Sequence, residues 1–169
     1  ETAIHAALTG HLVFSTLHTN SAAGAFARLI DLGVDSRMIG SACNIIIGQR
    51  LVRTLCPNCK VEREITVEES KMMQRILETS LAIHTIFDAK GCDACGGGGY
   101  KGRLGIFEAI LVDQKVEEAV LMDTREVAIR EAAKPQGIPT MQQDGIMKVL
   151  AGVTSLDEVS RVLDLYHGG

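Results

Sequence analysis

The sequence predicts an α/β fold in three consecutive parts: a strand-and-helix layer at residues 1–55, a cysteine-bounded segment at 56–103, and a returning strand with a helical bundle at 104–169. Three observations support this division. A short apolar run near the start lies between a glycine and a polar cluster, two Cys-x-x-Cys pairs bracket the middle, and capped apolar stripes at helical spacing fill the last part. The length of 169 residues suits one domain, or one and a fraction.

The composition is that of a globular protein and argues against several classes of protein. Hydrophobic residues make up 46% and charged residues 22%, so the chain can bury a core. A net charge of −4 and 4% aromatic residues argue against nucleic-acid binding, which needs a basic face and stacking rings. The sequence shows no apolar run near the ~20 residues that span a bilayer, and no export signal. Because it starts at Glu1 in mid-pattern, we expect it to be part of a longer protein.

The first part combines one predicted strand with two predicted helices. Residues 11–17 (HLVFSTL) are apolar and follow Gly10, which is typical of a strand buried on both faces of a parallel sheet. A helix is predicted over 22–32, with polar N-cap candidates before it and Gly33 as its stop. A second helix is predicted from about residue 35 to 55. Its apolar face would comprise Ile39, Cys43, Ile46 and Ile47, and its end would display Gln49, Arg50 and Arg53.

Four of the five cysteines form two pairs, each with two residues between the partners. Two such pairs present four thiolates at the corners of a tetrahedron, which is the geometry of closed structural Zn²⁺ sites. The predicted zinc ligands are Cys56, Cys59, Cys92 and Cys95. The alternative is two independent pairs, either redox-active or simply reduced. An odd total argues against a secreted disulfide framework, and Cys43 is predicted to be a core residue.

The segment between the cysteine pairs carries a predicted helix. Thr66 and Glu69 match a capping box, and apolar residues follow at helical spacing. The glycine-rich stretch at 96–103 supplies the tight turns that a metal knuckle needs. It is not a phosphate-binding loop, because the sequence contains no Gly-Lys dipeptide and therefore no Walker A motif. Residues 104–112 are predicted to form a second strand.

Three or four short amphipathic helices, forming a bundle, are predicted after that strand. The second ends before Pro135, and Gly152 stops the third. Ser155 and Glu158 match a capping box for the last helix. The predicted N-caps are Asp113, Asp123 or Thr124, Thr140 and Ser155.

The polar cluster after the first predicted strand is the best candidate for a ligand site. In open α/β sheets, ligands bind at the carboxyl ends of the strands. His18 at this edge can donate to a phosphate or orient a water, whereas His11 lies at the other end of the strand and needs the tertiary fold to reach it. Taken alone, a histidine at a strand end is more often structural. The other polar members are Ser15, Thr16, Thr19 and Asn20.

Several sequence blocks, taken together, resemble the secretion ATPase superfamily. The run at 1–20 (ETAIHAALTGHLVFSTLHTN) is similar to the His box region of that superfamily. Residues 49–60 and 91–103 are similar to the branch that contains the type II secretion ATPase and the type IV pilus extension ATPase, whereas the retraction ATPases lack the four cysteines. Between the Glu-Thr-Ala string and the Ala-Ala-x-Thr-Gly-His string, this chain has about three residues fewer than the family usually has. Three residues is close to the ~3.6 of one helical turn. The resemblance spans essentially the whole chain.

This resemblance implies the C-terminal portion of a RecA-like P-loop ATPase domain, with a tetracysteine zinc-binding subdomain and a C-terminal helical bundle. It further implies a homo-hexamer on the cytoplasmic side of the inner membrane, which hydrolyses ATP with Mg²⁺ to drive pilin or pseudopilin assembly. The implied partners are inner-membrane platform components of that machine. Because the Walker A and acidic motifs of the family lie upstream, the chain alone is expected not to hydrolyse ATP.

The same match gives roles to single residues. His11 and His18 are the His-box histidines near the γ-phosphate, and Arg103 contacts nucleotide at a subunit interface, where a guanidinium can bind phosphate oxygens bidentately. We also expect Thr16 and Asn20 to contact the nucleotide. Arg50 and Arg53 match family positions that make interdomain or subunit contacts. The alternative function is a stand-alone zinc-stabilised module that binds a protein or nucleic-acid partner without catalysis.

Overall fold

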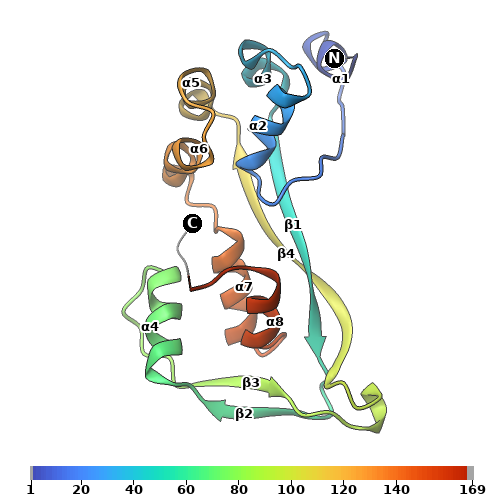
Figure 1. Ribbon diagram of the computed structural model, residues 1–169, viewed down its shortest axis with the longest axis vertical. Coiled ribbons are helices and arrows are strands. Elements are labelled where there is room, and N and C mark those ends of the chain that lie inside the picture. Colours follow the sequence, from blue (N-terminus) through green and yellow to red (C-terminus); the bar gives the residue numbers. More distant parts are fainter. Residues whose placement is uncertain (1, 167–169) are drawn as a thin grey trace. The chain divides into compact units, whose positions relative to one another are not determined.

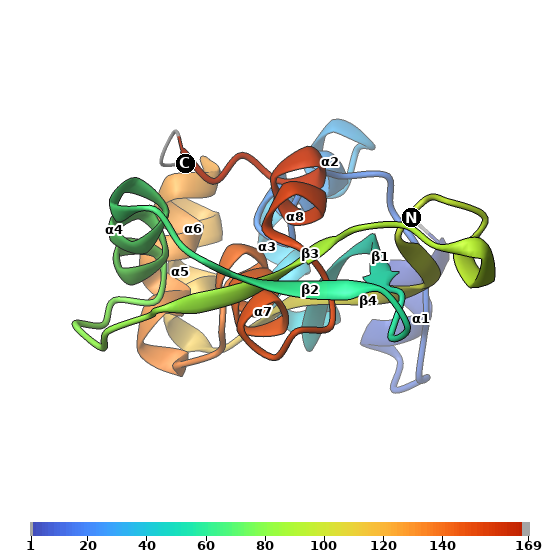
Figure 2. The ribbon, with the colours of Figure 1, turned by 90° about the horizontal axis from the view of Figure 1, so that it is seen from below.

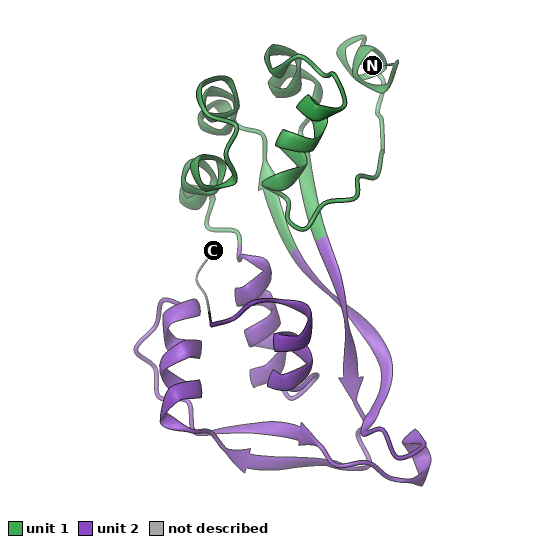
Figure 3. Cartoon of the chain, viewed as in Figure 1, with its two compact units in different colours: residues 1–48, 108–138 green, residues 49–107, 139–169 purple. Residues whose placement is uncertain are grey.

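The computed structural model describes residues 2–166, so Glu1 of the His-box run and residues 167–169 lie outside the described residues. Figure 1 gives the element order, and Figure 3 shows two compact units built from separated segments. Unit 1 comprises 1–48 and 108–138, and unit 2 comprises 49–107 and 139–169. The consecutive three-part division expected from the sequence remains a prediction.

Unit 1 consists of helices together with the ends of two strands. Its elements are α1 (Thr2–Leu8), α2 (Gly24–Asp31), α3 (Ser36–Ala42), α5 (Gln114–Met122), α6 (Glu126–Ala133) and the 3₁₀ turn η2 (Lys134–Gln136). They pack around the fully buried Phe26, Ile39 and Ile129. Gly33 ends the α2 turn with a φ of 89°, and its N–H donates to the carbonyl of Ile30, as the predicted helix stop requires.

The predicted second helix is wrong beyond Ala42. Helix α3 ends there, and the chain continues as strand β1, Ile45–Leu55, which forms a two-stranded sheet with β4, Tyr100–Leu111. Exposure alternates along β1, with Ile45 48% and Ile47 60% exposed on either side of the less exposed Ile46. Three consecutive β-branched side chains favour this conformation, because they pack well on a pleated surface and lose rotamer freedom in a helix. Strand β4 confirms the strand predicted at 104–112.

The predicted first strand is also wrong. Residues 11–19 form neither helix nor strand, and Leu12 and Phe14 are 79% and 89% exposed. A strand needs partners for its backbone N–H and C=O groups. Among the described residues, the two sheets use other segments, so this run has no ladder to join. The α/β class is correct, but its strands come from later residues.

Unit 2 contains a second sheet, three α-helices and the two cysteine pairs. Strand β2 (Lys60–Glu64) pairs antiparallel with β3 (Thr85–Ala89), and Lys60 faces Ala89. Figure 2 shows this pair running alongside α7, and α7 contacts β3. The helices are α4 (Val67–Ile76), α7 (Met141–Leu150) and α8 (Leu156–Val162), and the second cysteine pair lies at the 3₁₀ turn η1 (Asp93–Cys95).

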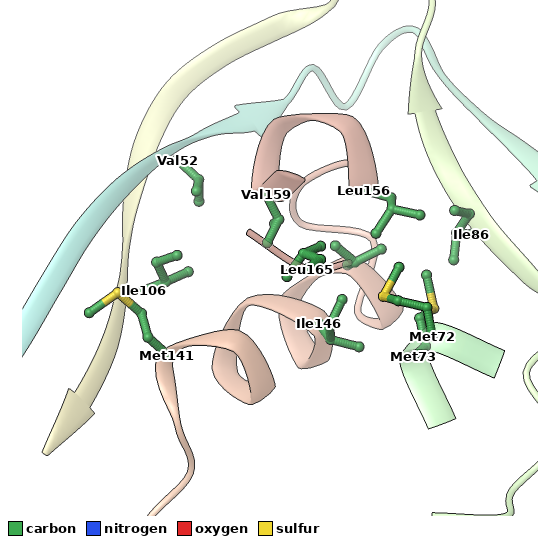
Figure 4. Packing of buried hydrophobic residues seen from close by; sticks show 11 residues of the cluster. Val52, Met72, Met73, Ile86, Ile106, Met141, Ile146, Leu156, Val159 and Leu165 are labelled. Carbon is green, nitrogen blue, oxygen red and sulfur yellow. The ribbon is translucent and has the colours of Figure 1, made fainter. Parts of the chain in front are cut away.

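The core of unit 2 is filled by aliphatic and methionine side chains from both of its segments. Figure 4 shows Ile146 of α7 and Leu156 of α8 among residues that precede them by dozens of positions, including Met73 and Ile106. All four of these side chains are at most 2% exposed. The two chain segments of unit 2 therefore share one core, and neither segment buries its apolar face without the other.

Most of the predicted helix caps are confirmed. Thr66 forms a capping box with Glu69 at α4, Thr140 caps α7, and Asp113 accepts from the N–H of Val116 at α5. For α6, neither Asp123 nor Thr124 is the N-cap. That helix begins at Glu126, with Arg125 at the N-cap, although Asp123 accepts from the Arg125 N–H. Ser155 caps α8 as predicted.

Candidate metal centre

The structure brings the four predicted zinc ligands together in unit 2. The Sγ atoms of Cys56, Cys59, Cys92 and Cys95 all lie within 4.8 Å of one another. The Sγ–Sγ distance is 4.0 Å between Cys56 and Cys92, and 3.8 Å in both Cys59–Cys95 and Cys92–Cys95. Tetrahedral bonds of about 2.3 Å to one zinc ion place sulfurs about 3.8 Å apart. The arrangement fits a single four-thiolate site, and all the cysteines are free thiols.

Backbone hydrogen bonds fold each cysteine pair into a tight turn. The carbonyl of Cys56, directly after β1, accepts from the N–H groups of Cys59 (3.2 Å) and Lys60 (3.0 Å). The carbonyl of Cys92 accepts from Cys95 (3.1 Å) and Gly97 (2.9 Å) in the same way. The two turns are joined because the Cys56 N–H donates to the carbonyl of Gly99, 2.9 Å away.

The backbone hydrogen bonds to Cys95 favour its thiolate form. The Sγ of Cys95 accepts from the backbone N–H groups of Cys92 and Gly99, each at 3.2 Å. The Cys92 N–H in particular lowers the pKa of the Cys95 thiol to about 6, whereas burial raises the pKa of Cys59 to about 12. A bound metal ion would supply positive charge that stabilises the thiolate form of all four cysteines, and its binding would displace the remaining protons.

Two glycines are required by the turn geometry. Gly91 has a φ of 97°, and a Cβ built there would lie 2.3 Å from the carbonyl oxygen of Gly97. Gly99 has a φ of 74°, and its Cβ would lie 2.6 Å from the Cβ of Ala89. Both positions combine a left-handed backbone with a closely packed neighbour, so only glycine fits. Gly99 supports the structural role predicted for the glycine-rich stretch at 96–103, whereas Gly91 lies before it.

We expect the substitution Gly91→Ala to destabilise the metal centre. The left-handed backbone and the clash with the Gly97 carbonyl together should lower the free energy of unfolding by about 2 kcal/mol or more. Gly98→Ala is the matched control, because Gly98 has no positive φ and its Cβ would lie 3.8 Å from the nearest atom, the Cys95 carbonyl oxygen. Urea denaturation of both variants measures the difference, and equal stabilities would contradict the role of Gly91.

The loop between α7 and α8 fastens the first cysteine turn to the rest of unit 2. The N–H of Leu55 donates to the carbonyl of Val153 at 2.8 Å. The Lys60 Nζ donates to the carbonyl of Gly152 at 2.9 Å, and it lies 4.6 Å from the centre of the Phe87 ring. These contacts fix the chain on both sides of the turn formed by Cys56 and Cys59.

A buried carboxylate anchors the same end of the unit, and the sequence pattern did not reveal it. Glu158 is fully buried, and its oxygens accept from the backbone N–H of Arg53 (2.9 Å), its Nη2 (2.6 Å) and Arg161 Nη2 (2.7 Å). Burial raises the pKa of Glu158, but the hydrogen bonds from Arg161 and Arg53 outweigh it and lower this pKa to about 2. The Arg53 guanidinium also stacks 4.2 Å from the ring centre of Tyr100.

The structure places the predicted nucleotide-site residues on exposed segments. His11 lies after α1, where its Nδ1 is 3.2 Å from the Thr9 Oγ1 and 3.3 Å from the carbonyl oxygen of Ala6. His18, Thr16 and Asn20 are exposed in the run that follows. Arg103 is an exposed residue of β4 in unit 2, whereas the histidines belong to unit 1. Their roles in nucleotide contacts remain predictions.

Comparison with known proteins gives the family. The model of the family described as "Type II/IV secretion system protein" matches residues 1–161. A type II secretion system protein E of Aeromonas hydrophila is 43% identical over 160 residues, which is 95% of this chain and 31% of that protein. A type IV pilus assembly ATPase PilB of Thermus thermophilus is 41% identical over 157 residues, 93% of this chain and 18% of that protein. The chain thus spans less than a third of the length of these curated relatives.

The fold is shared with a solved structure. The crystal structure of a pilus retraction motor PilT with bound ADP matches with a TM-score of 0.58 and 20% identity, covering 96% of this chain and 35% of that one. This likeness confirms the predicted fold class. Within residues 2–166, no helix has the length and apolar character that crossing a membrane requires. On the family match over 1–161, the chain belongs to the type II/IV secretion system protein family.

Proposed function

We propose that this chain is the C-terminal part of a hexameric ATPase that hydrolyses ATP to power pilin or pseudopilin assembly, in type II secretion or type IV pilus biogenesis. The observation that carries the proposal is the identity of about 40% over nearly the whole chain to relatives named type II secretion and type IV pilus assembly ATPases. The full-length protein would act on the cytoplasmic side of the inner membrane, with platform components as partners. This chain has no Walker A motif, so the segment that grips Mg·ATP lies outside it.

We infer that the four clustered cysteines hold one structural zinc ion. A four-thiolate set leaves no open coordination position, so the ion supplies folding free energy rather than chemistry. The sulfur spacing and the amide hydrogen bonds to Cys95 support this role. The zinc would fix the turns that connect β1 with β2 and β3 with β4.

For the ATPase reaction, His11, His18 and Arg103 are the proposed catalytic residues. The imidazole of His18 would contact the γ-phosphate or orient the attacking water, and the Arg103 guanidinium would stabilise negative charge on the phosphate oxygens. Thr16 and Asn20 would contact the nucleotide. All five of these residues are exposed in the structure, which is compatible with contact to a ligand. The alternative, a stand-alone zinc module, accounts only for the cysteine-bearing part, whereas the family match extends from residue 1 to 161.

In the full-length protein, we expect His18→Ala to lower kcat for ATP hydrolysis about 100-fold or more, with little change in KM, because proton transfer and orientation act mainly in the transition state. His5→Ala, which removes an exposed imidazole from α1, is the matched control. Steady-state ATP turnover measures both. A His18→Ala enzyme with unchanged kcat would remove His18 from the mechanism.

A further inference from the structure

The short loop that joins His18 to α2 is held firmly in unit 1. We refer to residues 19–23 as the α2 entry loop. Ser21 is 7% exposed, and Ala22 and Ala23 are each 1% exposed, whereas His18 lies outside in the exposed run. The loop also closes on itself, since the Thr19 hydroxyl donates to the carbonyl of Ser21 at 3.0 Å. The conformation of this loop therefore determines the position and direction of the backbone at His18, which directly precedes it.

Two glutamates from distant parts of the chain bind the α2 entry loop. Glu108, on β4, accepts from the N–H of Ala22 at 2.6 Å. Glu126, the first residue of α6, accepts from the hydroxyl of Ser21 at 2.8 Å, and the oxygen of that hydroxyl accepts from the N–H of Gly24 at 3.0 Å. Glu108 thus satisfies a backbone donor of the loop, and Glu126 holds the Ser21 hydroxyl that accepts from the first N–H of α2. The N-cap of α2, Ala23, offers no side-chain cap of its own.

The packing around Glu126 shows that the fit is close. A Cβ built on Gly24 would lie 2.8 Å from the Glu126 Oε1 and 3.1 Å from the Ser21 Oγ, so a larger residue would displace this carboxylate. Arg130, one turn later on α6, donates to Glu126 Oε2 at 3.2 Å, the same oxygen that accepts from the Ser21 hydroxyl. Helix α6 therefore fixes the position of Glu126. The hydrogen bond between Ser21 and Glu126 then fixes the α2 entry loop.

We infer that Glu108 and Glu126 are positioning residues for His18. They orient the α2 entry loop, and the loop holds the backbone of His18 in a fixed direction beside the nucleotide. The assignment rests on the proposed role of His18 in ATP hydrolysis. Neither glutamate contacts the reacting phosphate. Each acts through hydrogen bonds to the loop, and hydrogen bonds to charged acceptors are the stronger kind.

Amide hydrogen exchange of the full-length protein tests the positioning directly, by mass spectrometry on peptides that contain Ala22 and Gly24. We expect Glu126→Ala and Glu108→Ala to raise exchange in these peptides about tenfold. Glu126→Gln keeps an acceptor for the Ser21 hydroxyl, so it should restore protection. Glu131→Ala, which removes an exposed carboxylate from the same helix, is the control and should leave exchange unchanged.

ATP turnover of the same variants connects the loop to His18. The inference predicts that kcat falls about tenfold in Glu126→Ala with little change in KM, and recovers in Glu126→Gln. Unchanged exchange in both alanine variants would overturn the inference whatever the turnover. If exchange rises but kcat does not change, and His18→Ala does lower kcat, the positioning role of the glutamates fails. The role of His18 then stands. If His18→Ala itself has no effect, the proposed role of His18 fails and the positioning role fails with it.

Discussion

Replacing Cys92 with serine is expected to release the zinc ion and to unfold the cysteine-bearing end of unit 2. Cys92 is central to the cluster, with its Sγ 4.0 Å from that of Cys56 and 3.8 Å from that of Cys95. Structural zinc contributes on the order of 10 kcal/mol of apparent binding free energy in small zinc domains, and that free energy is also folding free energy. A hydroxyl in place of one thiolate leaves three sulfur ligands and an open position, so most of this stabilisation is lost.

The measurement combines metal analysis with thermal unfolding. The unsubstituted protein should contain about one zinc per chain, and Cys92→Ser should contain much less and melt at a lower temperature. The matched control is Cys43→Ser, because Cys43 is a partly buried thiol of unit 1 outside the cluster. It should retain zinc. Isolation of the unsubstituted protein fully folded and free of metal would contradict the site.

The second large effect is expected from Glu158→Ala. This carboxylate is fully buried, and removal of one partner from a buried ion pair typically costs about 3 to 5 kcal/mol. The arginine partners are 46% and 59% exposed, so water can solvate them after the change and the cost should fall near 3 kcal/mol. Asp157→Ala, at the neighbouring exposed position of α8, is the control. Urea denaturation compares the two, and similar stabilities would show that the buried network contributes little.

The pH dependence of stability gives an independent check on Glu158. Folding lowers the pKa of Glu158 from its ordinary value of 4.5 to about 2, so the folded state favours the ionised carboxylate. The resulting stabilisation is fully present above pH 4.5 and is lost as the pH falls toward 2. A shift of this size corresponds to a contribution of order 3 kcal/mol. Glu158→Gln should therefore lose less stability than the unsubstituted protein as the pH falls from 5 to about 2, and parallel pH profiles would argue against the lowered pKa.

Local signals predicted most of the helices, and they singled out the four cysteines that the structure brings together. A capping box such as Thr66 with Glu69 acts within one turn, so it works whatever the rest of the fold does. The Cys-x-x-Cys spacing is equally local, and only the meeting of the two pairs required the tertiary structure. These elements could be predicted because the sequence neighbours that define them are also their spatial neighbours.

Strands were predicted less well, because their partners are distant in the sequence. Ile39, Cys43 and Ile46 fall at helical spacing, yet the chain changes from helix to strand after Ala42, where the pairing of β1 with β4 decides the conformation. The run at 11–17 shows the opposite case, since it has strand composition but no strand partner among the described residues. Strand β2 was missed because charged residues dominate the Lys60–Glu64 segment, and its partner β3 was missed with it.

Glu158 shows how one local pattern can conceal a different role. Its position three residues after Ser155 predicts a capping box, and the Glu158 N–H does donate to the Ser155 hydroxyl. The side chain, however, binds Arg53, which lies 105 residues away in the sequence. Only the tertiary structure brings that arginine close, so no spacing rule could have found the pair.

The fastening of the first cysteine turn by the α7–α8 loop has a consequence for biosynthesis. The ribosome delivers all four thiols before it has made Gly152 and Val153, whose carbonyls accept from Lys60 and Leu55. At about 5 to 20 residues per second, a nascent chain spends seconds in which all four cysteines have been made but the α7–α8 loop has not. If the cysteines bind zinc as proposed, the order of synthesis makes metal loading an early step, and we expect a chelator to remove the ion most easily in that interval.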